Sequence, residues 1–132
     1  NGAWLYASAH TKIFAGVMVV CGYTRHRKET ETVAQALTTA GTPVLVVHSE
    51  DDSVIPVEAA DAVVQALQKY QHPSTKYIRY KHAPGPPMPE FASLIGHGSY
   101  ELAFRDKSVY EWMLAHTCEA CAGADVRATW RG

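Results

Sequence analysis

Two carboxylates and one histidine stand at positions where chemistry is expected. Asp51 and Asp52 follow a short apolar run over residues 44–47, and His97 lies between two glycines. A histidine with one ring nitrogen fixed by a carboxylate is held in one tautomer and can use its other nitrogen as a general base. The sequence therefore predicts an acid–base pair, provided that the fold brings these side chains together.

The apolar run over residues 44–47 predicts a strand that is buried on both faces of a parallel sheet. Asp51 and Asp52 stand where this strand should end, and Pro56 closes the loop before a helical pattern begins. Side chains that follow the carboxyl end of a parallel strand lie where open α/β sheets bind their ligands. The alternative is that Asp52 or Ser53 only caps the next helix. The histidine loop downstream favours the functional interpretation.

Hydrophobic periodicity predicts the elements that must position these residues. Helical spacing of apolar residues occurs in segments 1–10, 29–40, 58–70 and 108–116. Strands are expected over residues 14–21, 44–47 and 76–81. This alternation implies right-handed crossovers, and it predicts the α/β class with a parallel sheet of about three strands and flanking helices.

Composition excludes several classes of function. The chain has 132 residues, the length of one domain, and a formal net charge of -1 without a basic stripe, so no nucleic-acid partner is expected. No apolar run approaches the roughly 18 residues that a membrane span needs. The cysteines, Cys21, Cys118 and Cys121, are an odd and unpatterned set that favours a reducing compartment. We therefore expect a cytoplasmic protein without a metal or another cofactor.

Two segments resemble motifs of α/β-hydrolases in the dienelactone hydrolase, phospholipase/carboxylesterase and acylpeptidase-like branches. Residues 48–56, His-Ser-Glu-Asp-Asp-Ser-Val-Ile-Pro, are similar to the His-Gly-x-x-Asp-x-x-Val-Pro segment of these enzymes. In that pattern the catalytic acid falls on Asp52, not Asp51. Residues 96–100, Gly-His-Gly-Ser-Tyr, are similar to the loop of the catalytic histidine, which falls on His97. The resemblance covers about residues 1–116 and implies a partial α/β-hydrolase fold.

The nucleophile of that family has no counterpart in this sequence. The family places its serine in a Gly-x-Ser-x-Gly elbow, and no serine here has glycines two residues before and after it. The resemblance implies that the serine and the oxyanion hole lie upstream of Asn1, in a missing N-terminal half of the same domain. Residues 1–116 would then be the C-terminal half of a serine hydrolase domain and residues 117–132 a tail, inactive in isolation.

The substrate implied by the resemblance is a small molecule with a carboxylic ester or thioester bond. A proline-rich loop over residues 84–89 precedes His97, and we expect it to shape the acyl pocket. Pro86, Met88 and Tyr100 are the candidate substrate-binding residues, although packing roles are equally compatible with the sequence.

Two other functions stay open. The chain could be a non-catalytic remnant of an α/β-hydrolase that acts as a binding or interaction module. Alternatively, His48, Asp51, Asp52 and His97 could form a metal site, which is less favoured because no further histidine pattern accompanies the two loops. An upstream serine elbow would distinguish the first of these from an enzyme, and metal content would identify the second.

Overall fold

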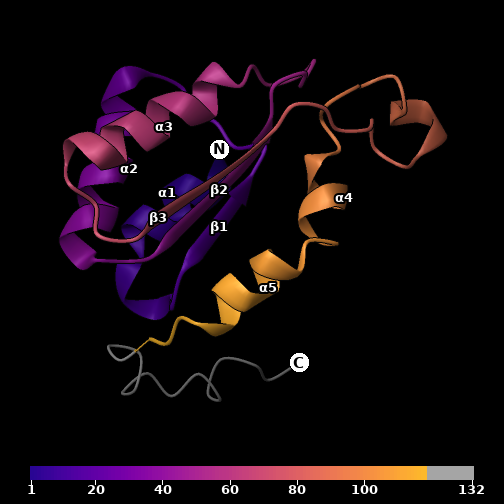
Figure 1. Ribbon diagram of the computed structural model, residues 1–132. Coiled ribbons are helices and arrows are strands. Elements are labelled where there is room, and N and C mark those ends of the chain that lie inside the picture. The colour runs from indigo at the N-terminus through magenta and orange to yellow at the C-terminus, as the bar shows by residue number, and fades with distance from the viewer. Residues whose placement is uncertain (119–132) are drawn as a thin grey trace, which may run out of the picture.

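The computed structural model describes residues 1–118. From the amino end the elements are α1 (Gly2–Ala9), the 3₁₀ helix η1 (Thr11–Ile13), β1 (Val17–Val20), α2 (Arg27–Ala40), β2 (Val44–Ser49), α3 (Glu58–Lys69), β3 (Thr75–Tyr80), the 3₁₀ helix η2 (Pro89–Phe91), α4 (Ser99–Ala103) and α5 (Lys107–Leu114) (Figure 1).

The three strands form one parallel sheet in the order β1-β2-β3. Val44 of β2 pairs with Val17 on one side and with Thr75 on the other, so the strands start level and their carboxyl ends meet at one edge. All six residues of β2 are buried. The predicted α/β class, with three parallel strands and a central strand buried on both faces, is confirmed.

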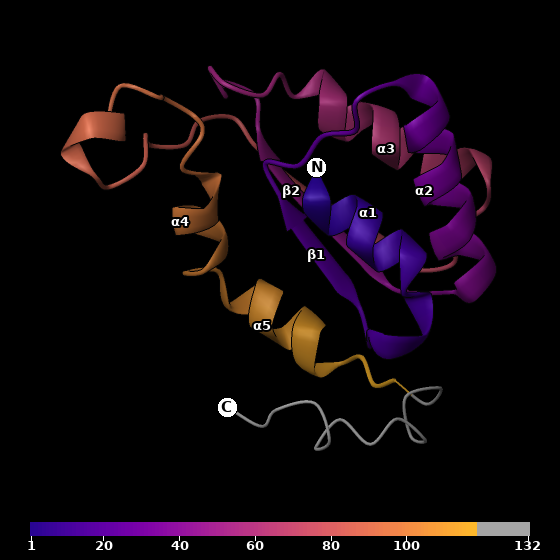
Figure 2. The same cartoon turned by 180° about the vertical axis from the view of Figure 1, so that it is seen from behind.

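Helices cover both faces of this sheet because successive residues of β2 point to opposite sides. Val44 and Val46 belong to a core formed with residues of α1, α2 and α3, among them Trp4 and Leu37. Leu45 and Val47 belong to a second core with α4 and α5, represented by Ala103 and Val109. Figures 1 and 2 show these two layers on either side of the strands.

The long helices lie close to their predicted bounds. Val63, Val64 and Leu67 give α3 one buried stripe, as the helical spacing requires. Helix α2 is capped at its end by Gly41, which adopts a φ of 65° in the left-handed region that glycine tolerates. The helix expected over residues 29–40 thus ends where it was predicted to end, and it begins two residues earlier, at Arg27.

Several details differ from the sequence prediction. The first strand is shorter than residues 14–21, because its hydrogen bonding to β2 starts only at Val17. The short helix α4 was not predicted, since its five residues are too few to show a period. Cys118 is disulfide-bonded, which the cysteine count did not predict, whereas Cys21 is a free thiol. The expected tail lies outside the described residues from position 119 onward.

Within residues 1–118, none of the helices combines the length and the apolar character that crossing a membrane would require.

Two leucines with opposite exposure test the assignment of the core. Leu37 is 0% exposed and Leu114 is 85% exposed. We expect Leu37→Ala to lower the free energy of unfolding by about 3 kcal/mol, because it removes buried methyl groups and leaves a cavity. The matched variant Leu114→Ala should change it by no more than about 0.5 kcal/mol. Urea denaturation of both variants measures the difference, and equal losses would contradict the described core.

Candidate active site

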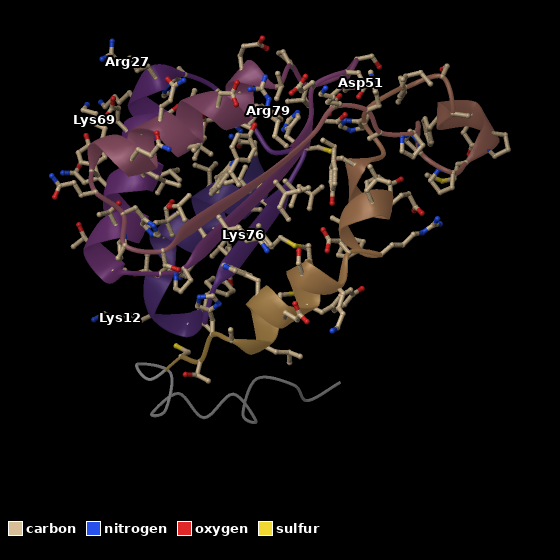
Figure 3. All side chains as sticks on the ribbon, viewed as in Figure 1. Lys12, Arg27, Asp51, Lys69, Lys76 and Arg79 are labelled. Atoms are coloured by element: carbon tan, nitrogen blue, oxygen red, sulfur yellow. The ribbon has the colours of Figure 1, made fainter. Side chains whose placement is uncertain are left out.

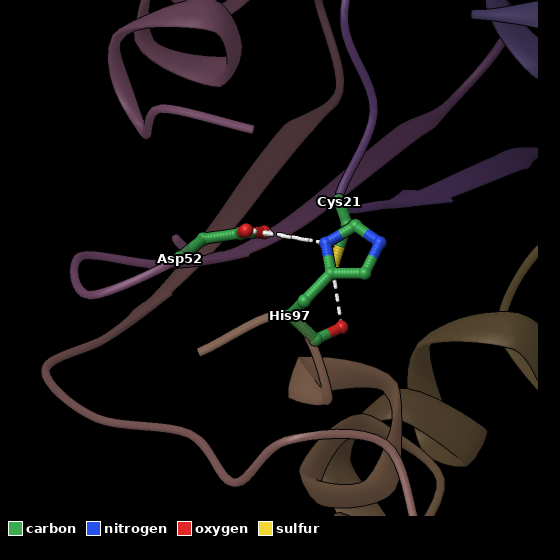
Figure 4. Close-up of side chains that lie close together, drawn as sticks. All are labelled: Cys21, Asp52 and His97. Atoms are coloured by element: carbon green, nitrogen blue, oxygen red, sulfur yellow. Dashed lines mark hydrogen bonds and ion pairs between the residues drawn. The ribbon is translucent and has the colours of Figure 1, made fainter. Parts of the chain in front are cut away.

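The residues singled out in the sequence gather at the carboxyl edge of the sheet. Asp52 lies in the loop after β2, His97 lies just before α4, and Cys21 follows β1 directly (Figure 4). Figure 3 shows Asp51 at this edge, at the opposite end of the sheet from Lys12. This is the edge at which open parallel sheets bind ligands.

Asp52 and His97 form a hydrogen-bonded pair. His97 Nδ1 lies 3.0 Å from Oδ2 and 3.1 Å from Oδ1 of Asp52. The Asp52 side chain is 0% exposed and that of His97 is 28% exposed. An imidazole that donates from Nδ1 to a carboxylate leaves Nε2 as its basic nitrogen. The structure therefore brings together an enclosed carboxylate and a partly accessible base.

Backbone groups of its own loop hold the Asp52 carboxylate. Oδ1 accepts hydrogen bonds from the N–H groups of Val54, at 2.8 Å, and Ile55, at 2.9 Å. Burial raises the pKa of Asp52, but the bonds from Ile55, Val54 and His97 together outweigh it, so the pKa lies below its ordinary value. The carboxyl group is thus ionised at neutral pH and ready to stabilise a protonated imidazole.

His48 supports this loop from the end of β2. Its ring is fully buried, and Nε2 lies 2.9 Å from the carbonyl oxygen of Ile55 and 3.4 Å from Oδ2 of Asp52. Because Nδ1 of His48 has no hydrogen-bond partner, the proton belongs on Nε2, where it can be donated to Ile55. His48 is therefore a strand-end residue whose hydrogen bond holds the loop after β2.

The neighbouring carboxylate, Asp51, serves a different contact. It accepts hydrogen bonds from the Ser49 hydroxyl and from the N–H of Ala83 at 3.1 Å, and it lies 3.2 Å from Nδ1 of His82. The Ser49 bond is the largest of the influences that hold the pKa of Asp51 below its ordinary value. Asp51 therefore ties the loop after β2 to the segment after β3, while Asp52 alone of the two contacts His97.

Both glycines beside His97 are required by close backbone packing. Gly96 has a φ of 81°, and a Cβ there would lie 2.3 Å from the carbonyl of Asp51. A Cβ at Gly98 would lie 2.6 Å from the carbonyl oxygen of Pro84. The absence of a Cβ at both positions lets the histidine loop lie against two other segments.

Cys21 is the residue at this site that sequence reasoning missed. It has a φ of 50°, unusual for a side chain with a Cβ, and its Sγ lies 2.9 Å from Ser99 Oγ and 3.4 Å from the carbonyl oxygen of His97. Burial raises the pKa of the Cys21 thiol, the Ser99 bond lowers it, and the charge of Asp52 raises it further. The net increase keeps the group a thiol. The sequence did contain one signal for Cys21: it stands at the end of the first predicted strand, at the same edge of the sheet as Asp52.

The three candidate substrate-binding residues lie in different environments. Pro86 is buried, Met88 is 47% exposed, and Tyr100 is half-buried in the first turn of α4. The proline-rich loop contacts the histidine loop directly, since the N–H of Gly98 donates to the carbonyl of Pro84 at 2.9 Å. Their role as substrate-binding residues stays a prediction.

The possible metal ligands differ from those considered in the sequence. His48 and Asp51 are engaged with Ile55 and with Ser49, Ala83 and His82. Within the described part of the chain, the potential ligand atoms that cluster are those of Cys21, Asp52 and His97, all within 4.8 Å of one another.

The comparisons with known proteins support the fold. No family model matches the sequence, and no curated protein matches it. The structure is similar to the crystal structure of a thermostable esterase, with a TM-score of 0.65 and 23% sequence identity. The match covers 87% of this chain and 28% of the esterase chain, so this chain corresponds to less than a third of that protein's length. The likeness is one of fold.

Alanine substitutions at two glycines with positive φ distinguish the stability cost of backbone strain from that of steric overlap. Gly41 has a φ of 65° with open space around it, whereas Gly96 has a φ of 81° and meets the Asp51 backbone. We expect Gly41→Ala to cost about 1–2 kcal/mol from strain alone. Gly96→Ala should cost about 3 kcal/mol, because overpacking adds to the strain. Urea denaturation compares the two, and a Gly96 variant no less stable than the Gly41 variant would refute the close packing.

The lowered pKa of Asp52 predicts how stability depends on pH. A folded-state pKa below the unfolded value contributes stability above the unfolded value, and this contribution is lost as the pH falls through the folded value. The difference in free energy of unfolding between the wild type and Asp52→Asn should therefore shrink as the pH falls below about 5. Urea denaturation across this range measures it.

Nuclear magnetic resonance provides an independent check on the same carboxyl group. The titration of the Asp52 carboxyl carbon in the wild-type chain should have its midpoint below about 3.9, the ordinary value for aspartate. A midpoint above that value would show that burial outweighs the hydrogen bonds.

Proposed function

We propose that this chain supplies the acid and the base of a Ser-Asp-His triad in a hydrolase that cleaves carboxylic ester or thioester bonds. The observation that carries the proposal is the hydrogen-bonded pair of an enclosed Asp52 and a partly exposed His97 at the carboxyl edge of the sheet. The likeness of the fold to that of an esterase supports it. The serine would come from a segment of the intact protein that precedes Asn1.

In this mechanism His97 moves protons and Asp52 stabilises it. Nε2 accepts the proton of the serine hydroxyl while the serine oxygen attacks the carbonyl carbon. The imidazolium then donates that proton to the departing alcohol or thiol, and a water molecule repeats the sequence to release the acid. Asp52, ionised and hydrogen-bonded to Nδ1, keeps the ring in the required tautomer and stabilises its positive charge.

Cys21 is not the nucleophile in this proposal. A thiolate, not a thiol, attacks acyl groups, and both burial and the nearby Asp52 charge raise the pKa of Cys21. Its sulfur is also engaged with Ser99 Oγ and the carbonyl oxygen of His97. The proposed nucleophile is therefore a serine outside this chain.

The proline-rich loop is proposed to contact the substrate. It is hydrogen-bonded to the segment that carries His97, through the carbonyls of Ala83 and Pro84. Met88, which is exposed, and the half-buried Tyr100 would then contact the acyl or alcohol group of a small ester, while Pro86, which is buried, would stiffen the loop that carries Met88. Apolar surface of this kind suits an uncharged substrate better than a phosphate-bearing one.

The experiment uses the intact protein, translated from the source transcript upstream of Asn1. We expect it to hydrolyse p-nitrophenyl esters and to react with a fluorophosphonate at a serine outside this chain. His97→Ala and Asp52→Asn should each lower kcat by a factor of about 10³–10⁴, because they remove the base or its correct tautomer.

The matched control is His82→Ala, which removes an exposed histidine that contacts Asp51 and not Asp52. Its kcat should stay within about twofold of the wild type. Near-normal turnover of His97→Ala would remove the assignment. An intact protein that neither hydrolyses esters nor reacts with fluorophosphonate would favour the binding module instead.

A further inference from the structure

One side chain at the site, that of Cys21, has no role in the predicted acid–base pair. Cys21 comes from the end of β1, and its thiol lies beside the Asp52–His97 pair (Figure 4). The three side chains offer a sulfur, a carboxylate oxygen and an imidazole nitrogen within 4.8 Å of one another. We propose that Cys21, Asp52 and His97 form a binding site for a thiophilic divalent cation, with zinc as the expected ion.

The three donor atoms are grouped closely enough to converge on one ion, since they all lie within 4.8 Å of one another. Zinc binds sulfur at about 2.3 Å and imidazole nitrogen or carboxylate oxygen at about 2.0–2.2 Å, so its ligands lie about 3.3–3.7 Å from one another. His97 Nδ1 and Asp52 Oδ2 are 3.0 Å apart. Side-chain movements that bring the Cys21 sulfur to tetrahedral spacing from these two atoms would complete the three-ligand set.

The charges and the softness of the ligands favour zinc or cadmium over magnesium or calcium. A thiolate and a carboxylate together neutralise a divalent ion, and imidazole suits the same metals. Magnesium and calcium prefer sites made of oxygen atoms and bind thiolates poorly. The fourth position can be taken by water, or by Ser99 Oγ, which lies 2.9 Å from Cys21 Sγ.

The protons balance in a simple way. The Cys21 thiol loses its proton to solvent when the sulfur binds the ion. The neutral His97 ring moves its proton from Nδ1 to Nε2, so Nδ1 becomes free to bind. Each bound ion thus releases one proton, and the affinity should rise with pH because the thiol must ionise.

Binding would switch off the proposed base, and this consequence rests on the proposed function. With the proton on Nε2, His97 can no longer accept the proton of a serine hydroxyl. The binding site itself does not depend on catalysis, because it is built from side chains of this chain alone.

The first experiment titrates the 132-residue chain with cadmium, a spectroscopic substitute for zinc. We expect an ultraviolet thiolate-to-cadmium absorption band that saturates at one ion per chain and is displaced by zinc but not by calcium or magnesium. Cys21→Ser should abolish the band, and His97→Gln should weaken the affinity by at least about 100-fold, since losing even a residue that supports a ligand costs 10–100-fold.

Two matched variants control for other sites. Cys118→Ser combined with Cys121→Ser leaves Cys21 as the single cysteine of the sequence, and His82→Gln removes the exposed histidine beside Asp51. Both variants should bind cadmium as the wild type does. Loss of the band in the double serine variant, or its persistence in Cys21→Ser, would overturn the proposal.

A measurement on the wild-type chain avoids any question of misfolded variants. Zinc should slow the alkylation of Cys21 by iodoacetamide at least about tenfold, read by mass spectrometry of the peptide, while calcium should not. Equal alkylation rates with zinc and with chelator would exclude the site.

A test in the intact protein separates this proposal from the proposed function. Zinc should inhibit ester hydrolysis reversibly. Zinc binding without any hydrolase activity would refute the proposed function, whereas the metal site would still stand.

Discussion

The complete burial of β2 is the constraint on which the rest of the structure depends. A central parallel strand needs hydrogen-bond partners on both sides and an apolar layer on both faces. The layer of α1, α2 and α3 covers one face, and α4 with α5 covers the other. The chain must therefore change faces after β3, and it does so in residues 81–98. That crossing starts at the carboxyl edge of the sheet, and it carries His97 over Asp52.

Backbone contacts between the two loops then fix the pair in place. The N–H of Ser53 donates to the carbonyl of Ile95 at 3.0 Å, and the N–H of Gly96 donates to the carbonyl of Ala83 at 3.0 Å. These bonds lie directly beside the catalytic candidates, so the distance between Asp52 and His97 is set by main-chain geometry more than by flexible side chains. Buried backbone groups need such partners, and here the same bonds orient the site.

The sequence revealed the features that have local causes. The apolar run of β2, the stripe of α3 and the acidic turn each reflect neighbouring residues, and the resemblance to hydrolase motifs selected Asp52 rather than Asp51. Contacts between segments that are distant in the sequence could not be predicted from local patterns. Cys21 reaches Ser99, 78 positions later, only because β1 ends beside the histidine loop. Helix α4 is too short for periodicity, and it forms because Ala103 completes the second core.

The site of Cys21, Asp52 and His97 can hold a proton or bind a cation, because both compensate the buried carboxylate of Asp52. Asp52 is enclosed, and a buried carboxylate is tolerated only when hydrogen bonds or charges compensate for lost hydration. Two of its partners, the N–H groups of Val54 and Ile55, belong to the loop and do not change. The third, His97 Nδ1–H, is the one that a metal ion could replace. Since Cys21 lies next to this third position, the chemistry of the base and the affinity for a thiophilic cation are two consequences of one requirement of Asp52.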